Sequence, residues 1–153
     1  MSPAVAFEIA RPGMERSAQR QWSKVTLLDV SAPWVLESLT NLAKLEPLRD
    51  NWDGYGSASV QAGALTSARK LVVSVRLQDL SAPHVSPVSG GAVGLHWHVG
   101  SRELELTVLP DGQIEYLKVL DQNLEREDAM QAGVLDAEHT AEVETMLTWL
   151  ING

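Results

Sequence analysis

Apolar and polar residues alternate most regularly between residues 90 and 120. Such alternation is typical of β-strands that bury one face. Gly100 and Ser101 interrupt the alternation and form the glycine-first pair that a type II′ hairpin turn requires. A hairpin that reverses there pairs apolar residues with apolar ones and polar residues with polar ones. The expected partners are Trp97 with Leu104, Leu95 with Leu106, Val93 with Val108, His98 with Glu103, and His96 with Glu105.

Turn signals on both sides of this hairpin extend the expected sheet. In LPDG, Leu109 to Gly112, proline suits the second position of a type I turn and glycine suits the left-handed residue after it. The next strand, IEYLKVL, is apolar on both faces, so its register stays open. Residues 84–91, HVSPVSGG, add a first strand that Pro87 restricts to an edge, because proline has no N–H for a central ladder.

Three segments have apolar residues at helical spacing. The first, residues 31–47, has Ser31 as its expected N-cap and Pro33 in its first turn. The second covers residues 59–80, and the third begins after Asp136 as N-cap. The residues expected on the buried faces are Val35, Leu39, Leu42 and Leu45, then Ala64, Ala68, Leu71, Val72 and Val75, and finally Val143, Met146, Leu147 and Leu150.

These elements predict an α+β fold, in which an antiparallel meander of three or four strands packs with about three helices in the order α-α-β-β-β-α. An N-terminal arm over residues 1–30 precedes them, and residues 5–10 and 24–30 within it suit short edge strands. A length of 153 residues without an internal repeat or linker indicates a single domain over residues 1–153.

The charge of the chain is distributed unevenly. Residues 1–101 hold nine Lys or Arg and eight Asp or Glu, whereas residues 102–153 hold three and twelve, so the excess acid behind the net charge of −8 lies in the last third. An acidic surface repels nucleic acid and attracts basic proteins, and a merely solvated surface is the alternative reading. We expect a basic protein partner and no direct contact with nucleic acid. The acidic residues expected to take part are Glu138, Glu142 and Glu144.

The composition also bears on location. The chain has no cysteine, so it forms neither a disulfide nor a thiolate zinc site. Its first residues contain no basic segment followed by a long apolar one, and no stretch approaches the roughly 18 to 20 apolar residues of a membrane span. We therefore expect a cytoplasmic protein without a membrane segment.

One face of the expected hairpin gathers groups that bind metals. His96 and His98 lie two residues apart on one strand and so point to the same side, opposite Glu103 and Glu105. Such a set can hold zinc or another divalent metal, and it could serve a small metal-dependent hydrolase or nuclease. Cross-strand His–Glu pairs on a solvated face are the alternative. No nucleophile or oxyanion-stabilising device accompanies them, so we expect no catalytic residues and no cofactor.

The segment RDNWDGYGS joins the first two expected helices. It lacks the ligand alternation of a calcium loop and the lysine of a phosphate-binding loop. We expect a tight corner in which Asp53 and Gly54 make a turn and Ser57 or Ser59 caps the next helix.

Two aromatic residues in this corner have two possible roles. They can anchor the loop to the core, or they can form a contact for a partner, because Trp and Tyr dominate the binding energy of many interfaces. The expected partner-binding residues of the loop are Trp52, Asp53 and Tyr55.

Two sequence blocks resemble a group of small bacterial proteins. The first block is NWDGYG, Asn51 to Gly56, and the second, over residues 90–116, is similar to the pattern GGxxLxWxxGxxELELxVxxDGxxxY, with one residue more between Gly91 and Leu95. The second pattern falls on Gly90, Gly91, Leu95, Trp97, Gly100, Glu103, Leu104, Glu105, Leu106, Val108, Asp111, Gly112 and Tyr116. The resemblance covers roughly residues 45–120. It carries over no catalytic residue.

Three functions are therefore open. The first is a non-enzymatic protein-binding module of bacterial or phage origin, such as an acidic inhibitor or antitoxin of a defence or toxin system that occupies the basic groove of a nucleic-acid-handling protein. The second is a structural module that forms a homodimer through the sheet edge or the N-terminal arm. The third is the metal-dependent hydrolase or nuclease of the His/Glu face. We rank them in that order.

Overall fold

A computed structural model describes residues 32–120, 129–136 and 140–152. These residues belong to one compact unit that begins at Ala32. They form three helices and a five-stranded antiparallel sheet, which confirms the α+β class. The N-terminal arm expected over residues 1–30 and the expected cap Ser31 lie outside the described residues. Within the described ranges, no helix is long and apolar enough to cross a membrane.

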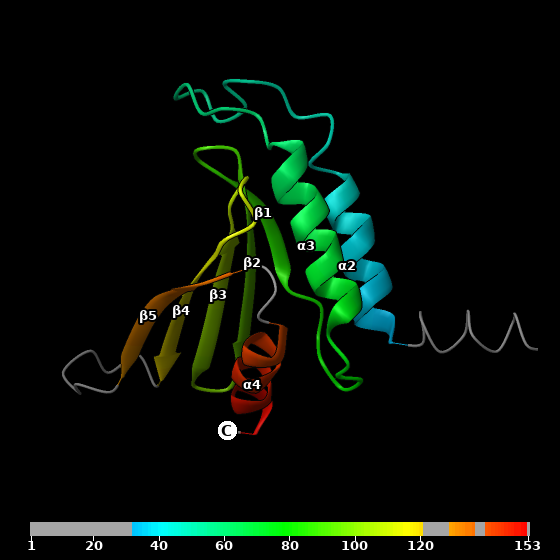
Figure 1. The fold of residues 1–153 in the computed structure, drawn as a ribbon, viewed down its shortest axis with the longest axis vertical. Helices are drawn as coiled ribbons and strands as arrows, with labels where there is room; N and C mark the ends of the chain where they lie inside the picture. The colour runs from blue at the N-terminus through cyan, green and yellow to red at the C-terminus, as the bar shows by residue number, and fades with distance from the viewer. Residues whose placement is uncertain (1–31, 121–128, 137–139, 153) are drawn as a thin grey trace, which may run out of the picture. The chain divides into compact units, whose positions relative to one another are not determined.

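Two helices precede the sheet and one follows it (Figure 1). Each strand pairs with its neighbours in sequence, in the order β1-β2-β3-β4-β5, so the sheet is a simple meander. The bounds are α2 Pro33–Ala43, α3 Ala62–Ser74, β1 His84–Val88, β2 Ala92–Val99, β3 Arg102–Val108, β4 Ile114–Leu120, β5 Met130–Leu135 and α4 Thr140–Ile151.

The hairpin of β2 and β3 has the register that the alternation predicts. Its apolar pairs are buried on one face, and its His–Glu pairs lie on the other. Gly100 has a φ of 61°, as the first central position of a type II′ turn requires. The observed partners are Val93 with Val108, Leu95 with Leu106, Trp97 with Leu104, His96 with Glu105, and His98 with Glu103.

The turn in LPDG is also confirmed, because the Gly112 N–H donates to the Leu109 carbonyl over 2.9 Å and Gly112 has a φ of 93°. This turn settles the register of β4 by setting Ile114 opposite Val108. As a result Ile114, Tyr116 and Lys118 lie on the face that carries the apolar pairs, while Leu117 and Val119 lie on the outer face.

Of the two edge strands of the sheet, the sequence predicts β1 but not β5. β1 is the expected edge strand and contains Pro87. β5 is the one strand beyond the three or four expected, and most of its side chains are exposed, so no period of two marks it. Tyr116 lies across Gly133, where an added Cβ would come within 2.7 Å of the phenol oxygen. The tyrosine thus covers the place that a β5 side chain would take.

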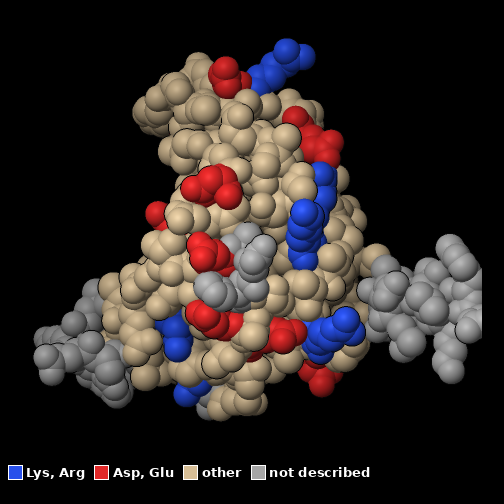
Figure 2. All heavy atoms as spheres, in the orientation of Figure 1, with Lys and Arg blue, Asp and Glu red and all other residues tan. Residues whose placement is uncertain are grey.

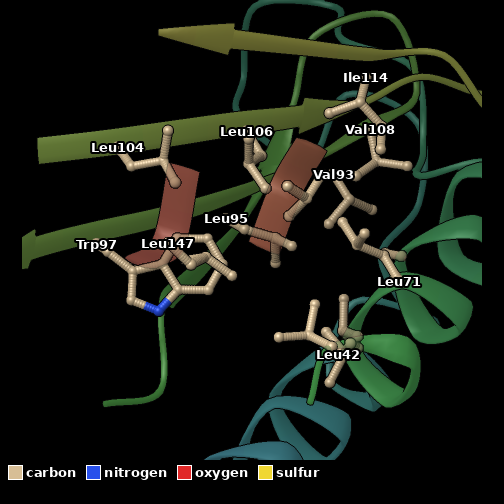
Figure 3. Close-up of a cluster of buried hydrophobic side chains, with 14 of the residues drawn as sticks. Leu42, Leu71, Val93, Leu95, Trp97, Leu104, Leu106, Val108, Ile114 and Leu147 are labelled. Carbon is tan, nitrogen blue, oxygen red and sulfur yellow. The ribbon is translucent and has the colours of Figure 1, made fainter. Parts of the chain in front are cut away.

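A single hydrophobic core joins the three helices to one face of the sheet (Figure 3). Every residue expected on a buried helix face belongs to it, with Leu39 only partly buried. Two tryptophans at its border hold the segment between α3 and β1, since Trp34 Nε1 donates to the Leu77 carbonyl over 2.7 Å and Trp97 Nε1 donates to the Ser81 carbonyl over 2.9 Å.

The helix ends differ from the expected ones. α2 and α3 are shorter than the apolar patterns suggest, and their N-caps are Ala32 and Gln61, neither of which makes a side-chain cap hydrogen bond. The expected capping of α3 by Ser57 or Ser59 is therefore wrong. The start of α4 before Thr140, and with it the expected role of Asp136 as cap, involves residues outside the described ranges.

Candidate functional site

The connection between α2 and α3 projects beyond the ends of both helices (Figure 1). Its residues 50–59 form what we call the braced loop. The Asn51 N–H donates to the Ser57 carbonyl over 2.7 Å, and the Gly54 N–H donates to the Asn51 carbonyl over 3.1 Å, which confirms a turn at Asp53-Gly54. Positive φ angles at Asn51 (65°), Gly54 (78°) and Gly56 (86°) let the chain reverse in this short space.

Three polar side chains hold the loop from within. Asp50 Oδ1 accepts the Ser59 N–H over 2.8 Å, and Asn51 Oδ1 accepts the Gly56 N–H over 2.7 Å. Asp53 accepts the Tyr55 N–H over 2.9 Å and the Ser57 hydroxyl over 2.5 Å. Local bonds of this kind satisfy backbone groups that have no ladder or helix partner. Ser57 and Ser59 belong to this loop, four and two residues before the N-cap Gln61, so neither serine stands at the position that caps α3.

The same bonds keep both carboxyl groups of the loop ionised. The Ser59 backbone N–H is the main cause that lowers the pKa of Asp50 below its ordinary value of 3.8. The Ser57 hydroxyl, followed by the Tyr55 N–H, lowers the pKa of Asp53 below the same value. Hydrogen bonds donated to a carboxylate favour its charged form. The loop therefore carries two negative charges at neutral pH.

The two aromatic residues of the loop have different surroundings. Trp52 is half-buried, and its Nε1 donates to the Ala58 carbonyl over 2.9 Å, so it closes the loop upon itself. Tyr55 is 92% exposed. Of the two possible roles, anchoring to the core is not seen for either residue, because neither belongs to the core cluster. The structure instead presents the ring of Tyr55 to solvent.

The braced loop is attached to the sheet beside the turn between β1 and β2. Ser57 Oγ lies 3.1 Å from Ser89 Oγ, and the Gln61 N–H donates to the Gly91 carbonyl over 2.9 Å. Gly91 has room for no side chain, since an added Cβ would come within 2.5 Å of the Gln61 side chain. The loop thus joins the first helix pair to the first hairpin.

The His/Glu face is brought to one side of the sheet, but its members are only partly brought together. His96 Nε2 lies 3.0 Å from Glu103 Oε1, its diagonal neighbour, and His98 is exposed. Among the described residues, no three His, Asp or Glu side chains lie close enough to hold a metal ion. The arrangement of His96, His98, Glu103 and Glu105 in this structure is therefore that of an open polar face with one His–Glu contact.

The acidic residues expected to meet a partner do not share one surface with the braced loop. Glu142 and Glu144 lie on α4, at the opposite end of the described fold, and Glu138 lies outside the described residues (Figure 1). Glu144 Oε2 accepts the Arg76 N–H over 2.6 Å and so ties α4 to the chain after α3. Figure 2 shows acidic side chains spread down one face of the described fold, with Lys and Arg side chains scattered among them.

A cluster that the sequence did not reveal lies where α4 meets the sheet. Arg102 Cζ and Lys118 Nζ lie 4.9 Å and 4.4 Å from the centre of the Trp149 ring, and Arg102 also donates to the Trp149 carbonyl. Burial, and then the charge of Arg102, lower the pKa of Lys118 below 10.5. These contacts fasten α4 to β3 and β4 through residues from three elements, and sequence spacing gives no signal for such a set.

No protein-family model, no curated protein and no solved structure matches the chain. The resemblance of its two sequence blocks to small bacterial proteins therefore stays a prediction. The fold and the site define a small α+β protein with an exposed aromatic residue on a hydrogen-bonded loop.

Proposed function

We propose that the protein is a non-enzymatic protein-binding module and that the braced loop is its main contact. The observation that carries this proposal is Tyr55, 92% exposed on a loop held by Asp50, Asn51 and Asp53. Packing a tyrosine ring against a partner removes a large apolar surface from water. A loop that is already ordered also loses little further conformational entropy on binding.

The charge of the chain supports a basic protein as the partner. Asp50 and Asp53 place two negative charges on the loop that carries Tyr55, and the whole chain has a net charge of −8. A Lys or Arg of the partner would be attracted by these carboxylates and by the face of the tyrosine ring. Nucleic-acid-handling proteins of the cytoplasm have such surfaces. An inhibitor or antitoxin that covers the basic groove of one of them is the role that suits this chemistry best.

Affinity capture with three tagged proteins tests the proposal. The wild type is compared with Tyr55→Ser and with Val73→Ser, a matched control that also removes an exposed large side chain, 54% exposed on α3. All three should unfold with free energies within about 0.5 kcal/mol of one another, because surface substitutions away from special features change little. We expect the wild type and Val73→Ser to retain a stoichiometric basic protein from host extract at low salt, and Tyr55→Ser to lose it.

Salt and the control variant decide how the capture is interpreted. The retained protein should be released as salt is raised, because the attraction between opposite charges is screened. Equal retention by the wild type and Tyr55→Ser would contradict a contact through the loop. Retention that is insensitive to salt would contradict the basic partner.

A further inference from the structure

β5 is an edge strand of the described sheet. Among the described residues it pairs with β4 alone, and it contains neither a charged residue nor a proline. Native edge strands usually carry such residues, which prevent pairing with another chain. In β1 that residue is Pro87. Met130 and Val134 of β5 are 47% and 57% exposed. In the part of the chain that the structure describes, the sheet thus has such a residue at one edge and none at the other.

The hydrogen bonds of the sheet decide which groups of β5 face the open edge. The Leu120 N–H donates to the Ala129 carbonyl over 2.7 Å, next to the pair Val119 and Met130. Bonded and non-bonded pairs alternate in an antiparallel ladder. Gln131, Gly133 and Leu135 therefore bond to β4.

The other residues of β5 direct their backbone groups away from the sheet. By the same alternation, the N–H and C=O groups of Met130, Ala132 and Val134 point to the open edge. The pairing of β4 with β3 leads to the same assignment. The Leu109 N–H donates to the Gln113 carbonyl over 2.8 Å, so the odd-numbered residues of β4 bond to β3. The even-numbered residues of β4 therefore bond to β5.

We propose that the chain forms a homodimer in which β5 pairs antiparallel with β5 of a second copy, about a two-fold axis at Ala132. In this register Ala132 faces Ala132 of the second copy, and Met130 faces Val134. All N–H and C=O groups that these three residues direct to the edge then find partners. A register shifted by two residues leaves one of them without a partner.

The side chains of β5 favour a second copy as the occupant. A two-fold axis perpendicular to the sheet keeps the outer faces on the same side, so Met130 packs against Val134 across the junction. Within β5 the pairing sets no like charges opposite each other, because this strand is uncharged while the whole chain has a net charge of −8. The repulsion between the two chains is therefore long-range, and salt should strengthen the dimer or leave it unchanged. This response is opposite to that expected for a basic partner.

A charge exchange at Ala132 tests this register. Because Ala132 faces itself, Ala132→Glu or Ala132→Lys alone places two like charges opposite each other, and an equimolar mixture places Glu opposite Lys. We expect sedimentation velocity to show a wild-type dimer, a dissociation constant at least about tenfold higher for each variant alone, and a restored dimer in the mixture. The matched pair Val73→Glu and Val73→Lys, at an exposed site of α3, should dimerise like the wild type.

The outcomes that overturn the proposal are distinct from those of the capture experiment. A monomeric wild type, or a dimer that Ala132→Glu and Ala132→Lys both leave intact, would overturn it. If a charged variant fails to fold, Ala132→Pro replaces it, since proline removes only the N–H that points to the open edge and edge strands tolerate it. This variant should also be monomeric, and a dimeric Ala132→Pro protein would overturn the proposal.

Discussion

Asp50, Asn51 and Asp53 order the braced loop by hydrogen bonds, with little burial. The sequence predicts the turn at Asp53 and Gly54, because this dipeptide favours left-handed backbone at the glycine. It does not predict the role of Asn51, whose φ of 65° is one that asparagine tolerates better than most residues. Nor does the sequence predict that Trp52 is half-buried while Tyr55 is exposed, because the burial of Trp52 depends on the position of the Ala58 carbonyl to which its Nε1 donates.

The lowered pKa values of the two loop aspartates predict how the loop responds to acid. A carboxyl whose pKa is lower in the folded than in the unfolded protein stabilises the fold fully above its unfolded value, and that contribution is lost as the pH falls through the folded value. The amide signals of Tyr55 and Ser59, which donate to these groups, should therefore shift with midpoints below pH 3.8 in NMR titrations. Midpoints at or above 3.8 would show that the bonds are not formed in solution.

At the scale of elements, the prediction from the sequence agrees with the structure where several local sequence signals coincide. The β2–β3 hairpin combines strict alternation with a glycine-first turn, and its register is the predicted one. β5 has neither signal, since Gly133 interrupts it and Tyr116 from the neighbouring strand completes its packing. The cap of α3 was mispredicted because the loop continues past Ser57 and Ser59 and the helix begins only after Gln61.

The turn of this hairpin gives a prediction about stability. Gly100→Val should lower the free energy of unfolding by about 1–2 kcal/mol, because a β-branched residue resists positive φ. The cost is backbone strain alone, since no atom lies within 4 Å of an added Cβ. Ser101→Val in the same turn is the control and should change stability by about 0.5 kcal/mol or less in denaturant titrations. Equal effects of the two substitutions would show that the turn conformation differs.

At the scale of the whole molecule, the two associations that we propose use different surfaces and depend on different forces. The braced loop offers an exposed aromatic ring and two ionised carboxylates, whereas β5 offers no charge and, among the described residues, backbone groups without a partner strand. The sequence shows the excess of acid but not its arrangement, because only the fold sets α4 and the loop at opposite ends (Figure 1). In the proposed complex, the charge of α4 would act on a partner at the loop through the long-range field, by raising the rate of encounter.

The affinity of the captured partner for the wild type and for Tyr55→Ser tests the account most directly, with Val73→Ser measured beside them. Removing a central aromatic contact costs about 2 kcal/mol or more, so Tyr55→Ser should bind roughly 30-fold more weakly or worse while Val73→Ser binds like the wild type. If Tyr55→Ser binds within about twofold of the wild type, a difference below about 0.5 kcal/mol, the braced loop is not the recognition surface.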